Sequence, residues 1–378
     1  MATTPVDPRV LEAMWPYFTA HFGNPASRTH AYGWSAAEAV DRARAQVASL
    51  IRATPREIVL TSGATEANNL AIKGVAEANR DRGDHLVTCV TEHRAVLDVF
   101  AALERRGFRV TRLPVDSAGS VDLERLEEAL AEEPVLLSLM AANNEIGTLQ
   151  PLEEIGRLVA ASGVIWHCDA AQAAGKVPVD VAGLPIDLLS MSAHKLYGPK
   201  GQGALFVRRR KPPLRLTPLI EGGGQERGLR SGTLNVPGIV GLGEACRLGG
   251  EEMSTDSARI GALRDDLESR LLDGLDGQVR RNGDPRRRLP GALSVSFTGI
   301  HGSDLLLALR DLAVSAGSAC SSGTGEPSHV LKAIGCDDVT AAATLRFGIG
   351  RFNTAGDIDY AARRTVHEAR RLSAPSVA

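Results

Sequence analysis

Seven short apolar segments, separated by helical patterns, constrain the fold of this chain more than any other feature. They lie at residues 57–61, 86–90, 109–113, 135–140, 164–167, 186–190 and 204–208. They lack a clean alternation of polar and apolar residues, as expected for strands whose sheet is covered by helices on both faces. This succession predicts an α/β fold with a large, doubly wound and mainly parallel sheet.

The pattern changes beyond residue 235. Helices are predicted at about 236–252 and 258–273, followed by a strand at 292–297, a helix at 303–311, and short strands near Ala313 and Thr344. This order predicts a smaller α+β domain. We therefore expect a large domain at 13–253 and a small domain formed by residues 1–12 and 254–378.

The N-terminal region carries turn-forming residues and one helix signal. Residues up to Tyr32 include Phe22-Gly-Asn-Pro-Ala-Ser-Arg and are predicted as an ordered loop. Ser35-Ala-Ala-Glu38 has the pattern of a capping box, so a helix is expected from there to about Leu50. Thr354-Ala-Gly-Asp357 is expected to cap the last helix.

Composition narrows the class of protein. A net charge of −2 gives no reason to expect a nucleic acid or an anionic membrane as partner, and no apolar run approaches the roughly 20 residues that span a bilayer. The first residues show no secretory signal pattern. Five scattered cysteines without a Cys-x-x-Cys pair indicate reduced thiols in a cytoplasmic enzyme, and the histidines show no metal-ligand spacing, so no metal is expected.

The segment Ser190-Met-Ser-Ala-His-Lys195 follows a predicted strand and leads into Gly198-Pro199. A lysine just past a buried strand can be held partly desolvated, which lowers the pKa of its amine and makes it nucleophilic. The chain has only six lysines, so candidates are few. We hypothesise that Lys195 binds pyridoxal 5′-phosphate as a Schiff base; an ordinary surface turn is the alternative.

Ser62-Gly-Ala-Thr-Glu66 lies between a predicted strand and a predicted helix. Small residues there expose backbone N–H groups at a helix N-terminus, where the helix dipole favours an anion such as a phosphate. A plain N-cap turn is the other interpretation of the same residues. Rossmann and P-loop fingerprints are missing from this region of the sequence, which disfavours a dinucleotide or ATP.

Three polar residues follow predicted strands, where open α/β sheets bind their ligands. Asp169 is placed to pair with a pyridinium nitrogen and keep it protonated, and Gln172 to reach the ring hydroxyl. His93 is placed to stack on the ring and to move protons. The alternatives are a metal-binding or capping role for Asp169 and a structural role for His93.

Further candidates lie outside the predicted cofactor site. Asn143-Asn144-Glu145 follows a strand and offers amides to a substrate, and Arg346 is suited to bind a carboxylate unless it is a plain surface charge. Cys320 lies in a loop of Gly, Ser and Ala at about 315–331, a setting suited to a reactive thiol. A free cysteine exposed by chance is the alternative for Cys320.

Nearly the whole chain resembles the cysteine desulfurases of the nitrogen-fixation and iron–sulfur-cluster type, which are fold-type I pyridoxal phosphate enzymes. The matching stretches are Ala2-Thr-Thr-Pro-Val, Phe22-Gly-Asn-Pro, Thr61-Ser-Gly-Ala-Thr-Glu, Thr91-Glu-His, Asn143-Asn-Glu-Ile-Gly, His167-Cys-Asp-Ala-Ala-Gln, His194-Lys, Gly198-Pro-Lys-Gly, residues 222–233, Gly317-Ser-Ala-Cys and Arg346-Phe-Gly. So many matches in one order make the resemblance specific.

The resemblance implies a role for each matching residue. Lys195 would bind the cofactor, Asp169 and Gln172 would hold its ring below a stacked His93, and Cys320 would accept sulfur from L-cysteine and carry it as a persulfide to an acceptor or iron–sulfur scaffold protein. Asn144 and Arg346 would bind the substrate carboxylate. The phosphate would be bound by Ala64, Thr65, Ser192 and His194, and by Thr233 of the second subunit of a homodimer.

The sequence also departs from the family pattern. Met1 stands in place of the family's usual first strand, Ala193 in place of a common glycine, and Gln225 in place of a histidine that some members have. No long tail follows Arg371, which leaves the acceptor open. A class V aminotransferase, a selenocysteine lyase and a non-catalytic scaffold are the competing functions. The first two would share Lys195 and Asp169, but an aminotransferase gives Cys320 no essential role.

Overall fold

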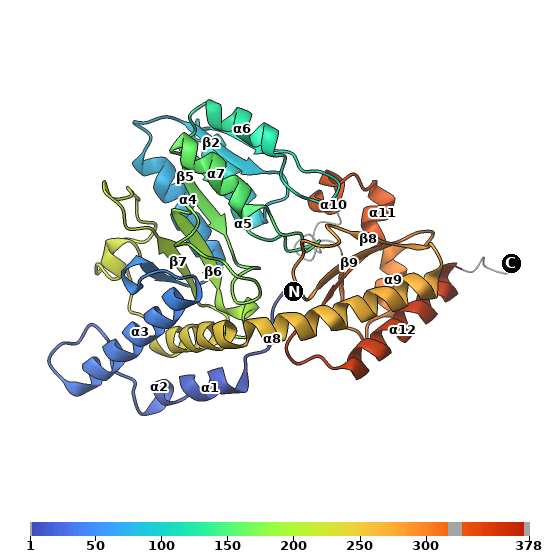
Figure 1. Cartoon of the computed structure of the whole chain (residues 1–378). Helices are drawn as coiled ribbons and strands as arrows, with labels where there is room; N and C mark the ends of the chain where they lie inside the picture. The colour runs from blue at the N-terminus through green and yellow to red at the C-terminus, as the bar shows by residue number, and fades with distance from the viewer. Residues whose placement is uncertain (1, 317–326, 374–378) are drawn as a thin grey trace.

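The computed structural model describes residues 2–316 and 327–373, and its larger sheet has seven strands in the order β1-β7-β6-β5-β4-β2-β3 (Figure 1). The strands are β1 (Ile58–Thr61), β2 (His85–Cys89), β3 (Arg109–Leu113), β4 (Leu136–Ser138), β5 (Ile165–Asp169), β6 (Leu188–Ser192) and β7 (Gly203–Val207). Neighbours from β6 to β3 pair in parallel, whereas β7 is antiparallel to β6 and β1. The prediction of an α/β fold with a mainly parallel sheet is confirmed.

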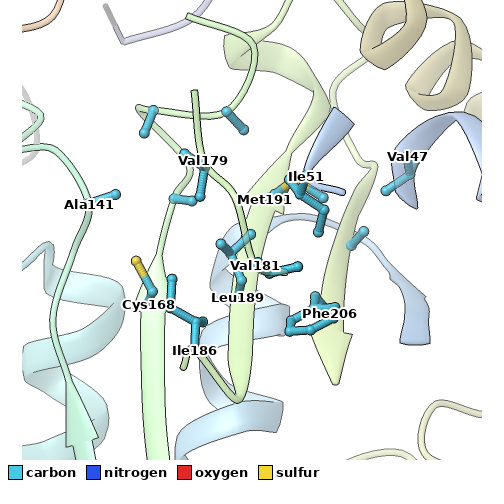
Figure 2. Close-up of a cluster of buried hydrophobic side chains, with 14 of the residues drawn as sticks. Val47, Ile51, Ala141, Cys168, Val179, Val181, Ile186, Leu189, Met191 and Phe206 are labelled. Carbon is cyan, nitrogen blue, oxygen red and sulfur yellow. The ribbon is translucent and has the colours of Figure 1, made fainter. Parts of the chain in front are cut away.

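Both faces of this sheet are buried. Successive residues of a strand point to opposite faces, and neighbours such as Leu188 and Leu189, or Leu205 and Phe206, belong to different apolar clusters. Figure 2 shows one face, where Leu189, Met191 and Phe206 pack with Ile51 and Val47. The strands therefore lack an alternation of polar and apolar residues because both faces of the sheet are buried, as expected.

Helices cover each face. The flanking helices are α3 (Ala31–Leu50), α4 (Ala64–Ala78), α5 (Arg94–Glu104), α6 (Leu123–Ala131) and α7 (Leu152–Ser162). Side chains of α4 and α5 form one apolar cluster with the sheet, and side chains of α3, α6 and α7 form the other. Because apolar layers close both faces, a polar side chain can reach a ligand only at the strand ends.

The smaller sheet is antiparallel, in the order β10-β11-β9-β8. Its strands are β8 (Val279–Asn282), β9 (Ala292–Phe297), β10 (Ser315–Ala316) and β11 (Thr344–Gly348), accompanied by the helices α9 (Gly302–Ala308), α10 (His329–Ala333), α11 (Asp338–Ala342) and α12 (Ala355–Ser373). Thr354 and Asp357 cap α12 reciprocally, as predicted. Strand β8, with the sequence Val-Arg-Arg-Asn, was not predicted because only its first residue is apolar.

One long helix packs against the large sheet at its start and against α12, beside the small sheet, at its end. The helices predicted at 236–252 and 258–273 form a single 40-residue helix, α8 (Val236–Leu275), which runs from the large sheet to α12 (Figure 1). The prediction of a break was wrong, because residues 253–257, Met-Ser-Thr-Asp-Ser, contain neither Gly nor Pro to stop a helix. The predicted domain boundary at 253/254 lies inside α8 and stays a prediction.

The N-terminal prediction was wrong in two places. Residues predicted as loop contain α1 (Pro8–Met14) and α2 (Pro16–Thr19), and α3 begins at Ala31 rather than at Ser35. The α1 start has a sequence signal, since Asp7 accepts from the Arg9 amide and Pro8 is the first helical residue. The Nδ1 atom of His30 accepts from the Gly33 amide and so caps α3, which a search for Ser, Thr or Asp caps misses.

Short 3-10 turns complete the described elements: η1 (Pro55–Glu57), η2 (Ala193–Lys195) and η3 (Glu226–Gly228). Within residues 2–316 and 327–373, no helix combines the length and the apolar character that crossing a membrane requires.

Arg351 ties the N-terminal segment, α8 and the turn after Lys195 together. Its guanidinium lies 2.8 Å from carboxylate oxygens of both Asp7 and Asp256, and it stacks over the ring of Tyr197 at 4.6 Å. The Arg351 amide also donates to the Tyr197 hydroxyl at 2.6 Å. Arg9 and Arg351 both hold the pKa of the buried Asp7 carboxyl below its usual range.

We expect Arg351→Met to lower the free energy of unfolding by about 2–4 kcal/mol, because it leaves the buried Asp7 and the half-buried Asp256 without one of their cations. The matched control is Arg42→Met, which removes an exposed pair with Glu38 and should cost less than about 0.5 kcal/mol. Urea denaturation followed by circular dichroism measures both. Equal losses in the two variants would contradict a special role for Arg351.

Candidate active site

A cavity of about 490 Å³ lies at the carboxyl ends of the parallel strands, where open α/β sheets bind ligands. Ten of the residues predicted to form the site line it: Ala64, Thr65, His93, Asn144, Asp169, Gln172, Ser192, His194, Lys195 and Arg346. Thr233 is exposed and is not among the lining residues. Cys320 lies outside the described residues.

Asp169 lies at the base of the cavity. It is the last residue of β5, which extends two residues beyond the strand end predicted at His167, and only 7% of it is exposed. Its Oδ2 accepts from Asn68 Nδ2 at 2.7 Å, and its Oδ1 accepts from the Ala171 amide at 2.9 Å. These two donors fix the carboxylate, whose remaining lone pairs can bind a ligand N–H.

Asn68 is a site residue that sequence reasoning missed. It lies on α4, is fully buried, and reaches Asp169 across 101 residues of sequence. An asparagine among the apolar residues of a helix's buried face is a signal for such a polar contact, because a buried amide must find partners. Because α4 begins with Ala64 and Thr65 and also carries Asn68, this one helix reaches both the predicted phosphate site and the Asp169 carboxylate.

Lys195 ends the η2 turn that follows β6. The N-terminal segment holds this turn, since the Thr4 amide donates to the His194 carbonyl at 2.9 Å and Thr4 Oγ1 accepts from the Tyr197 amide at 2.9 Å. Tyr197 has a left-handed φ of +61°, which such contacts help to maintain. The backbone of Lys195 is therefore fixed from both sides, and its side chain lines the cavity.

The start of α4 has the geometry predicted for an anion site. Gly63 precedes the helix with a φ of +152°, which favours glycine, and in the described structure no side chain caps it. A Cβ on Gly203 of the neighbouring β7 would lie 2.6 Å from Gly63 Cα, so these two glycines allow close packing. The first N–H groups of this 15-residue helix lie beside the cavity at Ala64 and Thr65.

Asn144 and Arg346 come together from different sheets. Arg346 lies in β11, is 6% exposed, and its Nη1 donates to the Asn144 carbonyl at 2.8 Å. Asn144 Oδ1 is buried and has no hydrogen-bond partner among residues 2–316 and 327–373. Asn143, which was expected to offer an amide to a substrate, instead donates to the Thr91 carbonyl and accepts from the Glu145 and Ile146 amides.

Burial sets the charge of several groups around the cavity. Burial, and then the charge of Lys195, lowers the pKa of His93, while Asp169 opposes this effect. Burial also lowers the pKa of His194. Burial, followed by the charge of Asp169, raises the pKa of Glu92 well above its usual range, and this carboxyl accepts from the Met140 amide at 2.6 Å. Burial therefore shifts both His93 and Glu92 toward their neutral forms.

The four described cysteines are buried, in agreement with the inert role expected for Cys89 and Cys168. Burial raises the pKa of Cys89 to about 11 and that of Cys246 to about 12. It also raises the pKa values of Cys168 and Cys336. In the described parts of the chain, no three His, Cys, Asp or Glu side chains are grouped to hold a metal ion.

A mainly parallel sheet with a lysine, an aspartate and a helix N-terminus around one cavity resembles the fold-type I enzymes. The comparison with protein families is specific: the chain belongs to the aminotransferase class-V family, whose model matches residues 1–361.

Curated relatives narrow the class. The chain is 54% identical to the cysteine desulfurase of Mus musculus over 371 residues, which cover 98% of this chain and 80% of that protein. It is also 54% identical to the cysteine desulfurase IscS of Anaeromyxobacter sp. (strain Fw109-5), with 98% and 91% covered.

Solved structures are similar to the whole chain. A NifS-like protein superposes with a TM-score of 0.91 at 40% identity and covers 98% of both chains. A structure described as SspA in complex with cysteine superposes with a TM-score of 0.82 at 38% identity, covering 93% of this chain and 98% of that one.

His167, two residues before Asp169 in β5, predicts how the stability of the protein depends on pH. Burial lowers the pKa of this histidine to about 4, and its ring nitrogens contact Ser138 Oγ and Ser190 Oγ at 2.8 and 2.9 Å. Because the unfolded state binds the proton more readily, its contribution to stability is complete above about pH 6.5 and falls as the pH drops toward 4. From pH 7 to pH 5 the loss should be about 2 kcal/mol.

We expect His167→Asn to remove this part of the pH dependence, since an amide keeps hydrogen-bonding groups but does not titrate. Urea unfolding at pH 7 and pH 5 tests this for both proteins. The difference between the two pH values should be smaller in the variant by about 2 kcal/mol. Parallel stability profiles would show that His167 is not the group responsible.

Proposed function

We propose that the protein is a pyridoxal-phosphate-dependent cysteine desulfurase that converts L-cysteine to L-alanine and leaves the sulfur on Cys320. The observation that carries the proposal is the single cavity that collects Lys195, Asp169, His93 and the start of α4. The names of the curated relatives and of the solved structure with cysteine support the same activity. Selenocysteine lyase and aminotransferase activities use the same groups and are the alternatives.

The lining residues fit pyridoxal 5′-phosphate. The cavity volume is in the usual range for a cofactor of this size. Asp169, fixed by Asn68, would hold the ring nitrogen as a cation, Gln172 would bind the ring hydroxyl, and His93 would cover the ring. The uncapped N–H groups of α4, with Thr65, Ser192 and His194, would bind the phosphate.

When bound, this cofactor withdraws electrons from the α-carbon of an amino acid. The protein's own groups then direct the chemistry. The Lys195 amine would hold the cofactor and afterwards take the proton from the substrate α-carbon and return it. His93 Nδ1 accepts from the Ala95 amide at 3.0 Å, so the neutral ring carries its proton on Nε2 and can donate it from there.

Arg346 and Asn144 would orient the substrate. A guanidinium binds a carboxylate through two parallel hydrogen bonds, and Arg346 is held in place by the Asn144 carbonyl. The side-chain amide of Asn144 lines the same cavity and would donate to that carboxylate. The two residues would thus both hold the carboxylate of L-cysteine.

Sulfur transfer is assigned to Cys320. The Cys320 thiolate would attack the substrate sulfur, so that the Cβ–S bond breaks, an S–S bond forms and alanine leaves after protonation. Cys320 would then carry the persulfide to an acceptor protein, such as an iron–sulfur scaffold or a thiolation protein. The high pKa values of Cys89 and Cys246 make them poor substitutes as nucleophiles.

We propose a homodimer in the cytoplasm. Thr233 is exposed and lies outside the cavity of its own chain, in agreement with a role at the phosphate of a second subunit. Large aromatic side chains are exposed on and around α1, α2 and α3, namely Trp15, Phe18, Phe22, Tyr32 and Trp34. Such a group of exposed apolar side chains favours a protein interface.

The cofactor assignment predicts a yellow protein in which Lys195 is modified after borohydride reduction. Lys195→Ala should lose this covalent label and lower the rate of alanine formation about 1,000-fold or more, because no amine remains to move the α-proton. Peptide mass spectrometry and an alanine assay measure the two effects. The control is Lys73→Ala, which changes a lysine that does not line the cavity and should keep both.

A reduced protein labelled on another lysine, or one that never binds the coenzyme, would contradict the assignment.

Cys320→Ser separates the desulfurase from an aminotransferase. The variant should keep the visible absorbance of the bound cofactor and lose sulfide release from L-cysteine by about 100-fold or more, because the serine hydroxyl is far less nucleophilic toward sulfur than a thiolate. Cys336→Ser, which changes a buried cysteine, is the control. An unchanged rate in Cys320→Ser would favour the aminotransferase.

A further inference from the structure

We propose that Lys176 is a positioning residue that fixes the orientation of the Gln172 amide, so that its nitrogen rather than its oxygen faces the cofactor. The inference rests on the proposed function, because it concerns the group that Gln172 would bind. Lys176 was not selected in the sequence, and it is not among the residues that line the main cavity.

The contact itself is direct. Lys176 Nζ donates to Gln172 Oε1 at 3.1 Å, four residues back along the chain. Gln172 is 5% exposed and lines the cavity next to Asp169 and Lys195. Lys176 does not line that cavity but borders a second, smaller pocket that Gln172 also lines, so its contact with the amide lies outside the main cavity.

The backbone around Lys176 is held on two sides. Its amide donates to the Ala173 carbonyl at 2.9 Å within the turn that follows β5, where Gly175 adopts a left-handed φ of +70°. Its carbonyl accepts from Ser257 Oγ on α8 at 2.7 Å. A side chain anchored in this way can impose an orientation on a neighbour instead of following it.

The chemistry of the two groups explains the consequence. The ends of a glutamine amide have nearly the same shape, but one accepts hydrogen bonds and the other donates them. An ammonium only donates, so it selects the oxygen of Gln172 as its partner. The nitrogen is then turned toward the cavity, where the ring oxygen of the cofactor would accept from it.

The charge of Lys176 depends on its neighbours. Burial, and then the charge of Lys195, lowers the pKa of Lys176 to about 7. In the proposed active form, Lys195 is bound to the cofactor and an anionic phosphate enters the cavity. Both changes favour the protonated form of Lys176, which is the form that orients Gln172.

A fixed donor at the ring oxygen has a spectroscopic consequence. It stabilises negative charge on that oxygen and therefore favours loss of the proton that the oxygen shares with the Lys195 nitrogen in the bound state. This proton controls the visible absorption of the cofactor. The pH midpoint of the absorption change thus reports the orientation of Gln172 without any substrate.

The test is a pH titration of the visible absorbance of the protein loaded with pyridoxal 5′-phosphate. Lys176→Met should raise the midpoint by at least about half a pH unit. Lys176→Arg keeps a donor-only cation, so its midpoint should lie between those of the wild-type protein and Lys176→Met. If Lys176→Met does not fold, Lys176→Gln replaces it, since a second amide cannot impose one orientation and should shift the midpoint in the same direction.

Two comparisons isolate the route through Gln172. In a Gln172→Leu background, Lys176→Met should cause no further shift. Lys200→Met removes an exposed lysine that also lines the cavity, and it should move the midpoint less than Lys176→Met does. Three results would overturn the proposal: an unchanged midpoint in Lys176→Met, a shift from Lys176→Met that is equally large in the wild-type and Gln172→Leu backgrounds, or an equal shift from Lys200→Met.

Failure of the wild-type protein to bind the cofactor would instead overturn the proposed function, and with it the role of Lys176.

Discussion

The burial of both faces of the seven-stranded sheet is the constraint on which the rest of the structure depends. Apolar clusters occupy the space above and below the strands. A polar side chain within the sheet is therefore buried at a high cost in free energy unless it finds a hydrogen-bond partner there. Polar groups that must meet a ligand are therefore confined to the strand ends. Asp169, at the end of β5, and Ser192, at the end of β6, occupy this boundary.

Burial next to the cavity acts in opposite directions on acids and bases. It raises the pKa of Glu92 and lowers those of His93, His167 and Lys176, so each of these groups is shifted toward its neutral form. The oxygens of Asp169 accept from two N–H donors. A carboxylate in a surrounding of mostly neutral groups is well suited to hold a single cation, because few other charges compete for it.

Much of the fold could be predicted from the sequence because its signals are local. All seven strands of the large sheet were located within two residues at their ends, since all except β3, which contains two arginines, are short and largely apolar runs between turn signals. The 40-residue helix was divided in two because the change in its buried face, from the large sheet to the small one, resembles a break in the pattern. That change depends on tertiary contacts, which a periodicity in one segment does not record.

The residues of the candidate site were predicted less completely than the fold. Residues that follow strands or begin a helix, such as Asp169 and Thr65, were found because their position has a physical meaning in an α/β sheet. Asn68 and Lys176 were missed, since each acts on another side chain rather than on a ligand. Asn143 was assigned to a substrate, but its amide holds the backbone of the loop that carries Asn144.

The two sheets meet at the groups proposed to bind the substrate. Arg346 comes from the small sheet, and its partner Asn144 follows a strand of the large one. The neighbouring Glu145 accepts from Ser328 Oγ at 2.5 Å, and burial raises its pKa to about 7. Ser328 caps α10, while His329 contacts the carbonyl of Glu92 at 3.0 Å.

Residues 328 and 329 thus contact the residues that directly adjoin Asn144 and His93 in the sequence. The start of α10 is therefore hydrogen-bonded to both loops, and these two contacts help to hold the loops that carry Asn144 and His93 in place.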